Sequence, residues 1–95
     1  MHMNLWIFTY KGERYMGNID ALGEDVICKD VYHIYRNPND PRNFCWERVE
    51  DIRDHYSEFE EGENRKPNQF ELNRYNSHML TARGIFPFNP AEEHD

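Results

Sequence analysis

The chain has 95 residues, which suits one domain with a modest core, and its 15% aromatic content argues against disorder. A formal charge of −7 disfavours direct nucleic-acid binding and favours basic partners. With no membrane-spanning stretch, no export signal and two cysteines, the sequence predicts reduced thiols and a cytoplasmic location.

The first 36 residues predict three antiparallel strands. Residues 4–10 are rich in β-forming side chains, and Lys11-Gly12-Glu13 is a turn in which glycine can adopt a positive φ. A second strand over 14–22 follows. The third covers 26–28 and 31–35, with an interruption near Lys29-Asp30.

A loop rich in proline and asparagine, 37–43, ends the strand region, and the pattern after it predicts a helix from Phe44 to Glu61 that stops at Gly62. At ~100° per residue, one side of this helix is apolar and holds it on the sheet. The apolar positions are Cys45, Val49, Ile52, Tyr56 and Phe59, with Trp46 off to one side. Six acids occupy the opposite side, which we call the acidic stripe: Glu47, Glu50, Asp51, Asp54, Glu58 and Glu61.

The acidic stripe would oppose its own helix, because like charges three or four residues apart repel by a few tenths of a kcal/mol per pair. Over the whole stripe the cost is of order 1–2 kcal/mol at low salt. One interpretation is a solvated face that keeps the protein soluble. The other is that the stripe binds a basic surface of a partner protein. Carboxylates one turn apart have a spacing of ~5–6 Å, near that of phosphates along a strand. By analogy with small acidic phage and mobile-element proteins, the sequence favours an inhibitor that occupies a nucleic-acid-binding surface.

A second helix is predicted to begin at Asn68, with Glu71 placed to complete a capping box. Leu72, Tyr75, Met79 and Ala82 give it one apolar side, and Gly84 ends it. Its polar side is a candidate homodimer contact. The extended segment 85–90 is expected to pack back on the core, and 91–95 to fray. The fold prediction is therefore a single α+β domain over 1–95, with a three-stranded antiparallel sheet followed by two helices packed on it.

The main alternative is a small nucleic-acid-binding or assembly module that uses the aromatic strand face. Its candidate residues are Tyr10, Tyr15, Tyr32 and Tyr35 with Lys11, Arg14 and Arg36. Tyrosine rings in strands more often fill a core with their hydroxyls at the rim.

Catalysis finds little support in the sequence. Asp51, His55 and Glu58 share one side of the predicted helix, but a histidine among surface acids is usually a salt-bridge partner. No CxxC or HxxxH spacing occurs, and neither Cys28 nor Cys45 lies in a nucleophile motif. The sequence thus predicts a non-enzymatic binding protein without a cofactor or metal.

Overall fold

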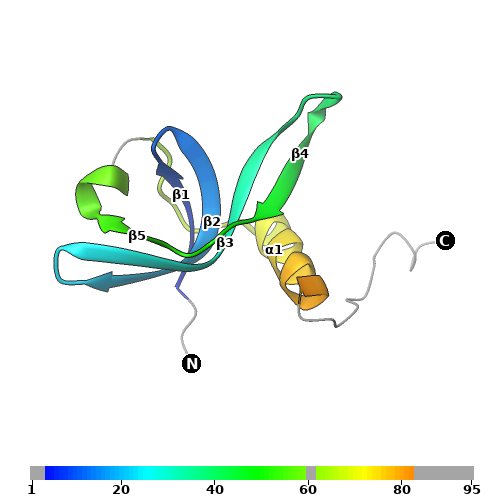
Figure 1. Ribbon diagram of the computed structural model, residues 1–95. Helices are drawn as coiled ribbons and strands as arrows, with labels where there is room; N and C mark the ends of the chain where they lie inside the picture. Colours follow the sequence, from blue (N-terminus) through cyan, green and yellow to red (C-terminus); the bar gives the residue numbers. More distant parts are fainter. Residues whose placement is uncertain (1–3, 60–61, 83–95) are drawn as a thin grey trace.

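The computed structural model describes residues 4–59 and 62–82 (Figure 1). The described elements are β1 (Leu5–Tyr10), β2 (Glu13–Leu22), β3 (Asp25–Asn37), β4 (Asp40–Arg48), β5 (Ile52–His55), a short 3-10 helix η1 (Tyr56–Phe59) and α1 (Gln69–Ala82). The α+β class and the antiparallel sheet are confirmed. The predicted three strands and two helices are wrong in detail, because the described residues form five strands and one α-helix.

The sheet is organised around the long strand β3. The strand order is β1-β2-β3-β4, and β5 pairs with the first part of β3. β2 pairs along one edge of β3, so β4 and β5 share the other edge one after the other. The interruption predicted near Lys29-Asp30 corresponds to Asp30, which lies at φ 52° between the two paired halves of β3. In Figure 1 the β3–β4 hairpin projects away from the other strands.

The helix predicted from Phe44 to Glu61 is the largest error. Residues 40–48 and 52–55 are strands, and 56–59 form η1. The loop 37–43 that was expected to cap a helix instead contains a hairpin turn, in which Asn39 N donates to Asn37 Oδ1 at 2.9 Å. Between β4 and β3, Trp46 lies opposite Ile34 and Cys45 lies opposite Tyr35. Aromatic and β-branched side chains suit these positions. Acids three or four residues apart repel each other on a helix, and an extended strand holds them farther apart.

Two hydrophobic clusters lie on opposite sides of the sheet, because successive residues of a strand point in opposite directions. On β1, Leu5 and Ile7 belong to the first cluster, together with Met16, Tyr32, Ile34, Tyr75 and Met79. Phe8 belongs to the second, together with Val26, Cys28, Val31 and Phe59. α1 therefore covers one face, and η1 contributes to the other.

The prediction of the second helix is confirmed at its start. Glu71 N donates to Asn68 Oδ1, and Asn68 N donates to Glu71 Oε1, both at 2.9 Å, which is the predicted capping box. Tyr75 and Met79 are buried against the sheet, and Leu72 packs beside them. The Tyr75 hydroxyl donates to Asp30 O at 2.7 Å. The side chain of Ala82 and the predictions for Gly84 and residues 85–95 lie outside the described residues. No described helix is long and apolar enough to cross a membrane.

Candidate functional site

The six acids of the predicted acidic stripe do not share one element. Glu47 lies on β4, Asp54 on β5 and Glu58 in η1, and all three were expected on a single helix. Glu50 and Asp51 are exposed in the connection between the two strands. Glu61 lies outside the described residues. A single helical row of carboxylates is therefore absent from residues 44–59, although the prediction that these acids bind a partner stays a prediction.

Asp54 is the acid of this set with a defined local role. The Tyr10 hydroxyl donates to Asp54 Oδ2 at 2.8 Å, and Lys11 Nζ lies 3.9 Å from the same oxygen. The hydrogen bond from Tyr10 is the largest cause of a pKa of Asp54 below its usual range. Asp54 therefore joins β5 to the β1–β2 turn.

Three of the four tyrosines of the alternative nucleic-acid surface, Tyr10, Tyr15 and Tyr32, serve mainly to pack the sheet. Tyr32 is buried in the first cluster. The Tyr15 ring stacks on Phe8 with 5.7 Å between centroids, and Tyr10 packs on Phe59 at 4.8 Å. These rings have their flat surfaces against protein, so they offer little area to a base.

Arg14 of that alternative instead lines a groove between the β3–β4 hairpin and the first half of α1, and Arg36 lies beside it against Phe44. Arg14, Ile34 and Trp46 form one cross-strand row, and Arg36 and Phe44 form the next. Phe70 and Arg74 of α1 line the other wall. The groove has a volume of about 320 Å³. We call it the arginine–aromatic groove, and its lining is completed by Arg42, Asn43, Asn68 and Glu71.

Guanidinium groups surround the aromatic rings of the groove. Phe44 lies between Arg36 and Arg14, whose Cζ atoms are 5.3 and 5.9 Å from its ring centroid. Arg74 Cζ lies 5.9 Å from the Phe70 ring, and Arg74 Nη2 also donates to Phe44 O at 3.4 Å. Phe70 is 69% exposed, an unusual value for a phenylalanine. The groove thus combines fixed positive charge with accessible ring surface.

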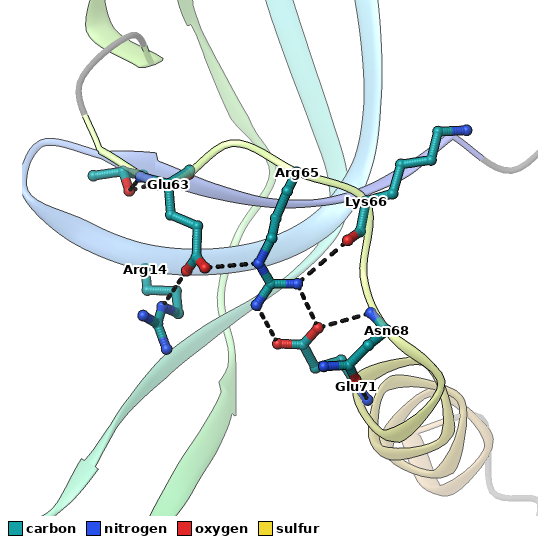
Figure 2. A network of polar contacts seen from close by, with 7 residues as sticks. Arg14, Glu63, Arg65, Lys66, Asn68 and Glu71 are labelled. Carbon is teal, nitrogen blue, oxygen red and sulfur yellow. Dashed lines mark hydrogen bonds and ion pairs between the residues drawn. The ribbon is translucent and has the colours of Figure 1, made fainter.

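An ion-pair network fixes the helix wall of the groove (Figure 2). Arg65 forms a two-pronged pair with Glu71 at 2.7 and 2.8 Å, and its Nε donates to Glu63 at 2.7 Å. Arg14 Nε lies 3.0 Å from Glu63. Residues 63–67 also reach β1, because Arg65 and Ile7 exchange two backbone hydrogen bonds. Glu71, the acid that lines the groove among the described residues, is therefore already neutralised.

The charge around the groove is opposite in sign to that of the whole chain. Residues 36–48 and 65–74, which supply most of its lining, hold six arginines and lysines against three acids. The chain as a whole carries −7. At physiological ionic strength charges more than ~8 Å away are largely screened, so a bound ligand experiences mainly the local excess of positive charge.

The residues weighed for metal or thiol chemistry are engaged elsewhere. His55 Nδ1 lies 3.0 Å from Asp25, away from the ligand set proposed with Asp51 and Glu58. In residues 4–59 and 62–82 no three histidine, cysteine or acidic side chains gather as a metal site. Burial raises the pKa of the Cys28 thiol to about 12, so it stays protonated at neutral pH.

The sequence prediction missed Phe44 and Phe70 as exposed residues and Trp46 as a half-buried residue that lines the groove. Trp46 was placed on the inner side of a helix, and Phe70 lies just outside the apolar side of α1. The available signal is the position of arginines near the two phenylalanines in the sequence. Arg36 and Arg42 precede Phe44 by eight and two residues, and Arg74 follows Phe70 by four. The chain matches no protein-family model, and a search of curated proteins finds none significantly similar to it in sequence.

Proposed function

We propose that the protein is a non-enzymatic binding module and that its arginine–aromatic groove binds single-stranded nucleic acid. The observation that carries this proposal is the position of Phe44 and Phe70 among Arg14, Arg36 and Arg74. Grooves that bind single strands combine cationic groups along the backbone with rings on which bases stack. This is the alternative raised from the sequence, with phenylalanines in place of tyrosines.

Single strands fit this groove better than duplexes. Phe70 is 69% exposed and Phe44 is 39% exposed, so both keep accessible ring surface beside the guanidinium groups on which an unpaired base can stack. Asn43 and Asn68 also line the groove, where Asn43 Nδ2 donates to Asp40 and Asn68 Oδ1 accepts in the capping box of α1. The small size of the groove favours a short segment, and the total charge of −7 disfavours long, nonspecific contacts.

The first prediction concerns Phe70→Ala. Removal of a stacking ring should weaken binding of a labelled single strand of about eight nucleotides by about fivefold or more, because stacking contributes ~1–3 kcal/mol per base. Fluorescence anisotropy at about 50 mM and 200 mM salt measures the affinity and its salt dependence. Arg74→Gln should make the plot of log affinity against log salt shallower by about 0.7.

Arg53→Gln is the matched control, because Arg53 is an exposed arginine on β5, outside the groove. It should leave the affinity for the oligonucleotide nearly unchanged. Equal losses for Arg53→Gln and Arg74→Gln would contradict a local groove. Absence of binding at the lower salt, with an acidic phenylalanine-containing peptide bound instead, would replace nucleic acid by a protein partner.

The hypothesis of a nucleic-acid mimic stays a prediction, although the helix on which it was argued is replaced by strands and η1. It required carboxylates one helical turn apart, and residues 44–59 contain two strands and a single turn of 3-10 helix. Docking on a basic partner does not require such a helix. Docking on a basic partner is therefore a separate proposal, which concerns a different surface of the protein.

A further inference from the structure

A second hollow lies on the face of the sheet opposite α1. It has a volume of about 470 Å³ and is lined by Trp6, Tyr56 and Phe59 with Ile19, Ala21, Val26, Asn4 and Asn64. Trp6, Ile19 and Phe59 are part of, or pack against, the second hydrophobic cluster. Three of the eight lining residues are aromatic and none is charged. We call this hollow the aromatic pocket.

The walls of the aromatic pocket are held in place by contacts among the lining residues and with their neighbours. Trp6 Nε1 donates to Asn4 Oδ1 at 2.8 Å, and Asn4 is itself bonded to Asn18 and Ile19. Phe59 packs on Phe8, with 5.6 Å between ring centroids. The Tyr56 backbone donates to Glu24 O at 3.3 Å, which joins η1 to the β2–β3 turn. The Tyr56 side chain is nevertheless 50% exposed, so its ring surface is accessible.

The segments that form the pocket are strongly acidic. Residues 18–26 and 51–59 hold six acids and one arginine, with His55 already paired to Asp25. Asp54 and Glu58, two acids of the predicted acidic stripe, belong to these segments. The segments beside the aromatic pocket are therefore acidic overall, in contrast to those around the arginine–aromatic groove, and Asp54 among them is paired with Lys11.

We propose that the aromatic pocket binds a lysine or arginine side chain of a basic segment of a partner protein. Cations are attracted to the faces of tryptophan, tyrosine and phenylalanine rings, and tryptophan is the strongest of the three. The apolar lining accepts the methylene stem of such a side chain, while the charged group stays near the surrounding acids. A purely apolar ligand would gain nothing from those acids. This inference does not depend on nucleic-acid binding by the groove.

The two tryptophans of the chain provide an internal test, because Trp6 lines the aromatic pocket and Trp46 lines the groove. We expect titration with a short peptide of alternating lysine and glycine to shift the Trp6 indole N–H signal in an NMR spectrum and to leave that of Trp46 in place. Tyr56→Ala should weaken this binding by about fivefold, the upper end of what an exposed cation–π contact provides. Because Tyr56 is half exposed, the variant should remain folded.

The matched control is Phe70→Ala, which removes an exposed aromatic ring from the other site. It should leave the lysine peptide bound with unchanged affinity. A second peptide with every lysine acetylated should lose most of the binding, because its charge is gone. Equal binding of the acetylated peptide would overturn the inference, as would an unmoved Trp6 signal or an unchanged affinity in Tyr56→Ala. Failure of the oligonucleotide to bind would affect only the groove.

Discussion

At Gly62 the chain turns with φ at 103°, and a Cβ placed there would lie 2.6 Å from Thr9 Oγ1. Thr9 Oγ1 accepts from Glu63 N at 3.0 Å and donates to Glu63 O at 3.2 Å. A side chain at position 62 would therefore disturb both the backbone and the bonds that place Glu63 in the ion-pair network. The sequence indicated an unusual conformation at Gly62, although it attributed this to the end of a helix.

We predict that Gly62→Ala lowers the free energy of unfolding by about 2–3 kcal/mol, since strain at a positive φ adds to the clash with Thr9. Urea unfolding followed by tryptophan fluorescence measures the change. Gly12→Ala is the control, because Gly12 also has a positive φ of 81° but has nothing within 4 Å of its Cβ position. It should cost only about 1–2 kcal/mol. Equal losses in both variants would show that the contact with Thr9 is unimportant.

Among the elements, α1 depends on a single acid for both its cap and its attachment. Glu71 accepts from Asn68 N within the capping box and pairs with Arg65, which bridges to β1. Hydrogen bonding from Arg65 is the largest cause of a pKa of Glu71 below its usual value. The lowered pKa means that the folded state prefers the ionised carboxylate.

We predict that Glu71→Gln destabilises the protein by about 1–2 kcal/mol at neutral pH, because the charge-assisted pair with Arg65 is lost. A depressed folded pKa stabilises the fold above the unfolded value of about 4.3, and this contribution disappears as the pH falls through the folded pKa. The difference between wild type and variant should therefore shrink between about pH 7 and about pH 3. Urea midpoints at both pH values measure it.

Glu50→Gln serves as the control for this pH dependence, because Glu50 is an exposed acid in the connection between β4 and β5. Its difference from wild type should be small at both pH values. A Glu71→Gln difference that did not change with pH would mean that the loss comes from contacts other than the charged pair with Arg65.

For the molecule as a whole, the segments around the two candidate sites differ in net charge. The segments around the groove have a net positive charge and those around the aromatic pocket a net negative one. Such a distribution orients an approaching partner and suits a module with two different ligands. Glu47 is exposed on β4, and Glu50 is exposed just after that strand. Both belong to the excess of acids, 18 against 11 bases, that gives the chain its charge of −7.

We predict that Glu47→Lys combined with Glu50→Lys leaves the melting temperature unchanged or raises it by a few degrees at low salt, since the net charge falls in magnitude. Thermal melts at low and high salt measure this, and high salt should reduce any gain. If these acids also contact a basic partner, its affinity should fall in the same variant. A clear loss of stability would show that the two carboxylates have stabilising contacts in the fold.

The sequence alone determined the local signals: the three strands up to residue 36, the turn at Gly12, and the capping box of Asn68 and Glu71. These depend on neighbours within a few residues, and their chemistry can be read directly. Tertiary structure decided residues 40–59, where the apolar spacing also fitted a helix. The free edge of β3 offered Trp46 and Cys45 cross-strand partners, and strand geometry removed the repulsion between nearby acids. Both candidate sites arose from the same choice, because the groove and the aromatic pocket join residues that only long-range strand pairing brings together.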